Sequence, residues 1–209
     1  MSSSDLVRRV RATGVRDPRV LAAMGEIPRA EFVAPADVDQ AYADKPLPIP
    51  HGQVTTQPSL VARMLEALAL GGSERVLEVG TGYGFQTALL ARLAHEVVSI
   101  ERFEDIARTA RENLERHGAT GVEVLVGDGS AGVPERAPFD AIVVSAAFTS
   151  VPEPLAEQLS LGGTLVQPVG PGGEDLVIAF RKGPEGLERK ADVTWAHFVK
   201  LYGAYGFQP

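Results

Sequence analysis

Residues 76 to 84 read Val76-Leu77-Glu78-Val79-Gly80-Thr81-Gly82-Tyr83-Gly84, a short apolar run followed by glycines at alternate positions. The apolar run is typical of a buried strand. Glycines directly after it let the backbone turn sharply and pass close to a ligand, because a side chain at those positions would fill the ligand's volume. The stretch therefore predicts a strand, a tight turn with a ligand site, and a following helix.

From residue 76 onward, short apolar runs alternate with helix-like stretches, which predicts βαβ units and a parallel sheet covered on both faces. We expect an α/β fold: a doubly wound, mostly parallel, seven-stranded Rossmann-like sheet with an N-terminal helical extension. The expected strands are 75–79, 96–100, 122–126, 141–145, 164–168, 175–181 and a last one around 195–201. The clearest helix is 103–117, where apolar residues recur at helical spacing and Gly118 follows as a stop.

The first 70 residues have a different texture and are expected to form a lid or collar over the core. They contain two short helical stretches and a Pro-rich segment at 45–50, then a helix that begins near Pro58 with Thr56 or Gln57 close to its cap. Since 209 residues is near the upper end of single-domain size, we expect one domain over 1–209. It comprises this N-terminal region, 1–70, and a cofactor-binding core, 71–209.

The composition excludes several classes of protein. With 20 Lys and Arg against 27 Asp and Glu, the formal net charge is −7. The sequence also has no sustained run of basic residues that could bind along a phosphate backbone, so nucleic acid is not expected as a partner. The chain has no cysteine, which removes disulfides and thiolate metal sites and favours a cytoplasmic protein. We see no signal peptide and no apolar run of about 20 residues that could span a bilayer. We expect a monomer without a membrane partner.

The glycine turn and an acid about twenty residues later together indicate a nucleoside-containing ligand. Gly80, Gly82 and Gly84 supply the turn. Glu101 follows the second expected strand, where a carboxylate can accept hydrogen bonds from both ribose hydroxyls. Dinucleotide-binding dehydrogenases share both features, so these residues alone leave two cofactors open. Glu101 could also serve only to pair with Arg102 or a nearby Arg.

Two further acids favour S-adenosylmethionine over a dinucleotide. Asp128, in Gly127-Asp128-Gly129, ends the third expected strand and could accept a bond from the adenine amine. Glu78 adds another carboxylate, and negative charge suits a cationic sulfonium better than a pyrophosphate. Both acids also have purely structural readings, Glu78 as a loop cap and Asp128 as a turn acid. The predicted cofactor-binding set is Glu78, Gly80, Thr81, Gly82, Gly84, Glu101, Asp128 and Gly129.

The end of the fourth expected strand bears on the methyl acceptor. It reads Ser145-Ala146-Ala147, which differs from the Asn-Pro-Pro-Tyr type of segment that holds an acceptor nitrogen. The sequence therefore does not favour an amine as the methyl acceptor. The four histidines are scattered without metal-ligand spacing, so no metal is predicted.

A set of ordered segments resembles one family, the protein-L-isoaspartate O-methyltransferases, which esterify the abnormal α-carboxylate of isoaspartyl residues. In the N-terminal region the matching segments are Pro28-Arg29, Phe32-Val33, Ala41-Tyr42, Leu47-Pro48-Ile49, Gly52-Gln53, Gln57-Pro58 and Val61-Ala62-Arg63-Met64. In the core they are Leu77 to Gly82, Gly84, Gln86-Thr87-Ala88, Gly127-Asp128-Gly129, Ala137 to Ile142 and Val151 to Leu155.

The resemblance implies a class I S-adenosylmethionine-dependent methyltransferase that repairs isoaspartyl-containing proteins or peptides. It implies an active-site hydroxyl at a position where this chain has Thr56 in place of the family's Ser. Thr56 would hold the acceptor carboxylate as the catalytic residue, although it could instead be the N-cap of the helix at Pro58. By the same analogy the substrate-binding residues are Val54, Thr55, Thr56, Phe198 and Val199.

Three departures from the family pattern keep other functions open. They are Tyr83 within the glycine loop, Phe85 for Tyr, and Lys200 where the family has Pro. Together with Thr56, they leave as alternatives a related carboxyl methyltransferase acting on a normal Asp or another acid, and a cofactor-binding homologue without catalysis. A carboxylate acceptor would need no general base, because an α-carboxyl group with a pKa of about 3.3–3.7 is already ionised at pH 7.

Overall fold

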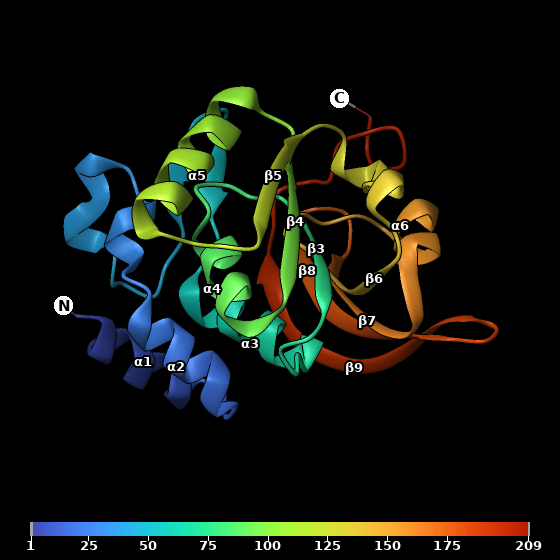
Figure 1. The fold of residues 1–209 in the computed structure, drawn as a ribbon, viewed down its shortest axis with the longest axis horizontal. Coiled ribbons are helices and arrows are strands. Elements are labelled where there is room, and N and C mark those ends of the chain that lie inside the picture. The colour runs from blue at the N-terminus through green and yellow to red at the C-terminus, as the bar shows by residue number, and fades with distance from the viewer. Residues whose placement is uncertain (1, 209) are drawn as a thin grey trace.

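The computed structural model describes residues 2–208, which fold around one seven-stranded sheet in the order β5-β4-β3-β6-β7-β8-β9 (Figure 1). The strands are β3 (Arg75–Val79), β4 (Glu96–Glu101), β5 (Val122–Val126), β6 (Phe139–Val144), β7 (Leu159–Val169), β8 (Glu174–Gly183) and β9 (Gly186–His197). The first five are mutually parallel, while β8 and β9 run antiparallel at one edge. The predicted mostly parallel α/β sheet is confirmed.

Helices cover both faces of the sheet, because alternate residues along each strand are apolar on both sides. On β3, Val76 belongs to one buried cluster and Leu77 to the other. The first cluster lies under α3 (Pro58–Leu68), α4 (Phe85–Leu93) and α5 (Glu104–His117), and the second under α6 (Glu153–Gln158), as Figure 1 shows on opposite sides of the sheet. The predicted helix at 103–117 and its stop are confirmed, since Gly118 is the left-handed C-cap with φ 77°.

The N-terminal region wraps one side of this core. It consists of α1 (Ser3–Ala12), α2 (Pro18–Glu26), the 3-10 helices η1 (Arg29–Phe32) and η2 (Pro35–Gln40), and a hairpin of β1 (Leu47–Ile49) with β2 (Gln53–Thr55). The hairpin was not expected within a Pro-rich stretch. It is compatible with Pro48 because a two-stranded ribbon has free edges, where a missing N–H costs no ladder bond.

The start of α3 corrects one alternative for Thr56. Pro58 opens the helix as predicted, and its N-cap is Gln57, which makes no side-chain capping bond. Instead Asp44 accepts a hydrogen bond from the backbone N of Ser59, at 2.9 Å. The reading of Thr56 as N-cap is therefore wrong.

The last strand also differs from the prediction. β9 ends at His197, and residues 198–207, here called the C-terminal segment, leave the sheet edge for the loop after β6. There Val199 and Leu201 exchange backbone hydrogen bonds with Ala147, both of 2.8 Å. Most of β9 is solvent-exposed, and it carries four charged residues between Glu188 and Asp192, so its sequence lacks the apolar pattern on which strand prediction depends.

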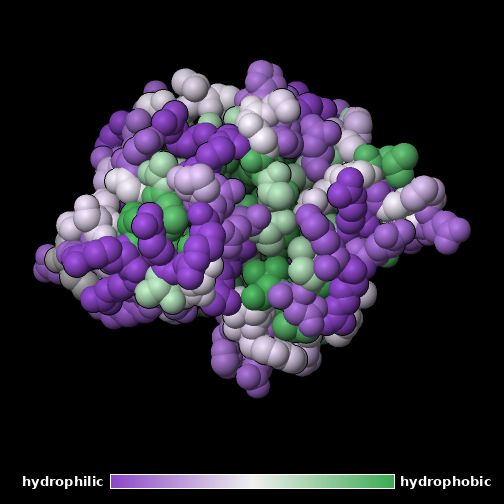
Figure 2. Space-filling model, turned by 90° about the horizontal axis from the view of Figure 1, so that it is seen from below, coloured by the Kyte–Doolittle hydropathy of each residue, from purple (hydrophilic) through white to green (hydrophobic). Residues whose placement is uncertain are grey.

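Hydrophobic side chains gather in a hollow between hydrophilic rims on the face shown in Figure 2. Among residues 2–208, the helices are all too short or too polar to cross a membrane.

Candidate active site

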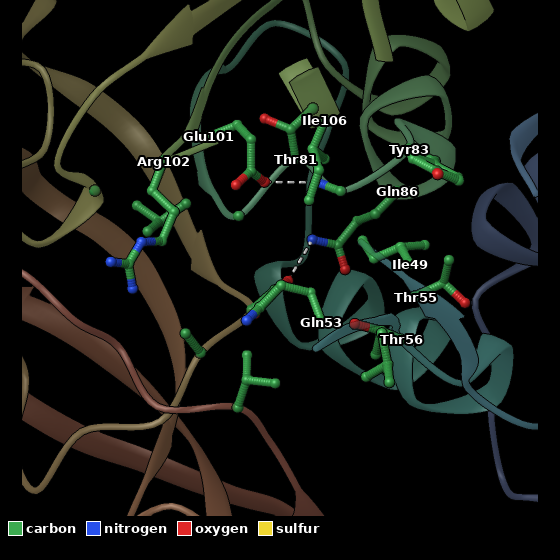
Figure 3. Close-up of a pocket in the computed structure, with 18 of the residues that line it drawn as sticks. Ile49, Gln53, Thr55, Thr56, Thr81, Tyr83, Gln86, Glu101, Arg102 and Ile106 are labelled. Atoms are coloured by element: carbon green, nitrogen blue, oxygen red, sulfur yellow. Dashed lines mark hydrogen bonds between the residues drawn. The ribbon is translucent and has the colours of Figure 1, made fainter. Parts of the chain in front are cut away.

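A cavity opens at the carboxyl ends of β3, β4 and β6, where an open parallel sheet places its ligands. Its empty volume is about 920 Å³, part of it open to solvent, within the range of ~300–1,000 Å³ usual for ligand sites. The glycine loop and Glu101 lie on one side, the β1–β2 hairpin on another, and residues 199–202 of the C-terminal segment complete the wall (Figure 3).

The glycine loop brings bare backbone to this cavity. Gly80 and Gly82 have φ of 95° and 55°, which favours glycine, and both line the cavity. A Cβ on Gly80 would lie 3.4 Å from Cβ of Ser145. Thr81 also lines the cavity, and its hydroxyl lies 2.6 Å from that of Ser99. Gly84 lies outside the lining: it is the N-cap of α4, and a Cβ there would lie 3.2 Å from Leu114 of α5, so the structure gives no support to its predicted contact with the cofactor.

Glu101 braces the loop and faces the cavity. One carboxylate oxygen accepts a hydrogen bond from Gly82 N at 3.0 Å and the other from Phe103 N at 3.2 Å (Figure 3). Burial raises the pKa of this carboxyl, against the opposing effect of those two backbone donors. Arg102 lies over the rings of Phe103 and Tyr202, at 4.9 and 5.3 Å from their centroids. This stacking replaces the suggested pairing of Arg102 with Glu101.

Asp128 and Gly129 follow β5 at the edge of the cavity. Gly129 lines it, and a Cβ there would lie 2.5 Å from Val79, which requires glycine. The Asp128 carboxylate accepts bonds from Ser130 N at 2.9 Å and from Ala204 N at 2.6 Å. Burial opposes a low pKa for Asp128, but bonds from Ser130 and Ala204 outweigh it and lower the pKa. Asp128 thus fastens the C-terminal segment and lies just outside the lining residues.

Glu78 lies beneath the glycine loop and outside the cavity, so the structure gives no support to its predicted contact with the cofactor. It is fully buried and accepts hydrogen bonds from Gln86 at 3.0 Å, Thr87 at 2.5 Å and Ser99 at 2.6 Å. Because side chains alternate along a strand, Glu78 shares the face of Val76, under α4. Its carboxylate joins β3, β4 and α4.

The Glu78 carboxyl makes stability depend on pH. Burial raises its pKa from 4.5 to about 7. Between these values the folded chain holds a proton that the unfolded chain has lost, so the free energy of unfolding should fall as pH rises, by roughly 3 kcal/mol in total. The Glu78→Gln variant should lack this fall. Urea unfolding of both proteins between pH 5 and 8 measures it, and parallel pH profiles for the two proteins would contradict the prediction.

A second cavity adjoins the first between α3, β9 and the hairpin. Four residues line both cavities: Val54, Thr56, Ser145 and Val199. Thr55 lines only the first, and its hydroxyl is used by Arg29 and by the backbone N of Leu47, at 3.0 and 3.1 Å. Phe198 lines only the second. The structure therefore brings the predicted substrate residues together around a junction, at which Thr56 is one of two hydroxyl-bearing side chains.

Several lining residues were missed by sequence reasoning. The second hydroxyl at the junction, Ser145, was noted only as a departure from amine-type segments. Ile49, Gln53 and Gln86 stand in segments that resemble the family, but nothing in those segments indicated that they face the cavity. Among the missed residues are Ile49, Gln53, Gln86, Arg102, Ser145, Lys200 and Tyr202. Most of these residues reach the glycine loop only through the tertiary fold, because they are distant from it in the chain. Gln86 is different, since it follows that loop directly, in the first turn of α4.

The fold and this cavity define the class. A parallel sheet with an antiparallel strand pair at one edge, a glycine loop after its first core strand and an acid after the second is the arrangement of class I S-adenosylmethionine-dependent methyltransferases. A solved protein-L-isoaspartate O-methyltransferase superposes with a TM-score of 0.84 at 31% identity, over 98% of this chain and 67% of that one. A β-aspartate methyltransferase from Plasmodium falciparum, solved with S-adenosyl-L-homocysteine, shares the fold with a TM-score of 0.83 at 22% identity, over 97% and 99%.

Sequence comparisons then identify the family. Residues 1–205 match the family model "Protein-L-isoaspartate(D-aspartate) O-methyltransferase". A protein-L-isoaspartate O-methyltransferase from Methanoculleus marisnigri is 52% identical over 95% of this chain and 90% of its own. One from Anaeromyxobacter sp. is 50% identical over 98% and 97%. The chain belongs to the protein-L-isoaspartate(D-aspartate) O-methyltransferase family, and its cofactor is S-adenosylmethionine.

Proposed function

We propose that the first cavity binds S-adenosylmethionine, that the second receives the isoaspartyl peptide, and that Thr56 positions the acceptor carboxylate where the two meet. The observation that carries this proposal is the shared lining: Thr56 and Ser145 are the hydroxyl-bearing residues common to both cavities. The Thr56 hydroxyl makes no hydrogen bond within residues 2–208, whereas that of its neighbour Thr55 already accepts two. The Thr56 hydroxyl is therefore free to donate a hydrogen bond to a substrate at the junction of the two cavities.

The residues of the first cavity fit this cofactor. Gly80 and Gly82 offer backbone without side chains, and Glu101 offers carboxylate oxygens to ribose hydroxyls. Gln86 has its amide nitrogen 3.0 Å from both Glu78 and Ser145, which leaves its oxygen buried and, within the described chain, without a donor. The ammonium group of S-adenosylmethionine would supply one, and the buried Glu78 behind the amide favours a cation there.

Catalysis then rests on positioning. S-adenosylmethionine supplies an electrophilic methyl group, and the acceptor carboxylate, ionised at pH 7, needs no base. Thr56 donates a hydrogen bond that orients this carboxylate. Ser145 accepts from Gln86, so its own proton is free for the same task. The hairpin and the C-terminal segment exclude water, and such orientation can lower a barrier by about 7–11 kcal/mol in favourable models.

The peptide would lie along the walls of the junction. Val54 and Thr55 on the hairpin, with Phe198 and Val199 on the opposite wall, would offer backbone groups to an extended chain on either side of the isoaspartyl residue. Val54 supports this role because 44% of its surface is exposed although it belongs to the paired strand β2.

Removing the Thr56 hydroxyl tests the proposal. In Thr56→Val, we expect kcat/KM on an isoaspartyl peptide to fall about 10- to 100-fold, because a charge-assisted hydrogen bond contributes about 1.5–3 kcal/mol. Thr56→Ser should retain most activity. The Kd for S-adenosylhomocysteine, measured by calorimetry, should change little because the hydroxyl faces the acceptor. Each assay includes the normal aspartyl twin peptide, on which wild type should show no turnover.

A matched control is Thr120→Val, which removes an exposed hydroxyl outside both cavities and should leave all values unchanged. Equal turnover of the isoaspartyl and aspartyl twins would overturn the assigned acceptor. Full activity of Thr56→Val would overturn the role of Thr56 alone.

We further propose a cytoplasmic monomer in which residues 1–209 act as one methyltransferase domain. One buried cluster combines residues of 1–70 with residues of the sheet, such as Leu6 and Met64 with Val76 and Val97, which supports a single folding unit. Sedimentation at micromolar concentration tests the monomer.

A further inference from the structure

The second cavity carries an unbalanced positive charge. The described residues that line it include the guanidinium of Arg63 but no Asp or Glu. This contrasts with the whole chain, which has a formal charge of −7. A positively charged lining in an acidic protein indicates that this cavity attracts anionic groups.

Arg63, which lines the cavity, has N–H donors that make no hydrogen bond within residues 2–208. It projects from α3, where its guanidinium donates to the backbone oxygens of Thr13 and Val193, the latter at 3.4 Å. A guanidinium has five N–H donors, so these two bonds leave others free. Within residues 2–208, none of the ion pairs involves Arg63. Its charge is thus held in place by neutral carbonyls and lacks a carboxylate partner.

Asp44 is not a lining residue, but its carboxylate binds two residues that are. Asp44 accepts hydrogen bonds from the backbone N of Ser59 at 2.9 Å and from Gln57 at 3.1 Å. Its charge is offset by the N-terminus of α3 and by the nearby guanidinium of Arg29. Asp44 therefore does not cancel the attraction that Arg63 offers to an anion in the cavity.

We propose that the second cavity is a subsite for an acidic residue that flanks the isoaspartyl residue, with Arg63 as the cation that selects it. This inference rests on the proposed placement of the acceptor carboxylate at Thr56. Arg63 follows Pro58, the first residue of α3, by five positions, or about 7.5 Å of helix. An extended peptide advances about 3.3 Å per residue, so the preferred acid lies about two to three residues from the isoaspartyl residue. Only the flank that enters this cavity should show the preference.

Trp195 offers a direct report of occupancy. It lines the second cavity, is 64% exposed and is the only tryptophan in the chain. An isoaspartyl peptide added in the presence of S-adenosylhomocysteine cannot turn over, so a change in tryptophan fluorescence gives its Kd. Steady-state assays give KM and kcat for the same peptides.

The test compares peptides with Glu or Gln at each of four positions on both sides of the isoaspartyl residue. We expect Glu to lower Kd and KM about two- to tenfold relative to Gln on one flank only, as befits a partly exposed charge pair. Arg63→Met should bring this ratio to about one, Arg63→Lys should retain most of it, and Arg92→Met, a surface control paired with Glu26, should leave it unchanged. High salt should also reduce the ratio in wild type.

A Glu to Gln ratio that persists in Arg63→Met, or a ratio of one in wild type, overturns the inference. If Arg63→Met fails to fold, the lysine variant and the salt dependence of wild type decide the question. Failure of the proposed function looks different, because then no isoaspartyl peptide in the panel is methylated.

Discussion

Replacing Glu101 with alanine is expected to raise the Kd for S-adenosylmethionine at least about 100-fold. Glu101 accepts hydrogen bonds from Gly82 N and Phe103 N at 3.0 and 3.2 Å and still faces the cavity, where it would accept from the ribose. Hydrogen bonds to a charged group contribute about 1.5–3 kcal/mol each, and two such bonds to the ribose correspond to about two orders of magnitude or more. The variant also leaves both backbone donors without their acceptor.

Calorimetry with S-adenosylhomocysteine measures this effect without catalysis. Glu104→Ala is the matched control, because Glu104 lies in the exposed first turn of α5 and its carboxylate is 69% exposed. An unchanged Kd in Glu101→Ala would show that the cofactor binds elsewhere in the cavity. A reduced unfolding temperature with normal Kd would assign Glu101 a purely structural role.

The second large effect concerns Arg29, whose replacement by methionine should lower the free energy of unfolding by about 3–5 kcal/mol. The side chain is only 1% exposed and donates to the backbone oxygens of Ala41, Ala43 and Lys45 at 3.0–3.1 Å, and to the Thr55 hydroxyl at 3.0 Å. Burial lowers the pKa of Arg29 to about 10, so it stays charged at pH 7. Methionine fills similar volume but removes all four hydrogen bonds; the oxygens of Ala43 and Thr55 keep only their bonds from Lys45 N and Leu47 N.

Urea unfolding measures the loss, with Arg9→Met as a control expected to stay within about 0.5 kcal/mol because Arg9 is exposed on α1. Since Arg29 holds the segment that leads into the hairpin, kcat/KM should fall as well. A variant of unchanged stability would mean that water replaces the guanidinium at these carbonyls.

The core of the fold could be predicted because its signals are local. The apolar runs of the parallel strands and the helical spacing in α5 need no knowledge of their neighbours, and Gly118 ends that helix through its own conformational freedom. The β1–β2 hairpin and β9 have no such signal. The first is a short ribbon organised by the buried Arg29, and the second is a charged edge strand that forms by pairing with β8.

The candidate site shows the same division. Gly80, Gly82 and Glu101 could be located because the ends of parallel strands meet at one edge of the sheet. Glu78 sits at the same edge, but its side chain points to the opposite side, toward α4, where Gln86 and Thr87 bind it. The alternation of side chains along a strand predicts which side of the sheet Glu78 faces. The prediction that Glu78 contacts the cofactor used its charge alone and did not apply this alternation. Ser145 became a candidate only when both cavities could be seen to share it.

The C-terminal segment affects the order in which the cavity forms during protein synthesis. Its residues close the first cavity and bind back to Asp128 and Ser130 through Ala204 N and Tyr205 N, yet they follow the other lining residues of that cavity in the chain. Ribosomes deliver a protein from its N-terminus, and early parts begin to fold first. The sheet and glycine loop can therefore assemble while one wall is still being made, so a nascent chain lacks a closed pocket until residues 199–205 have emerged.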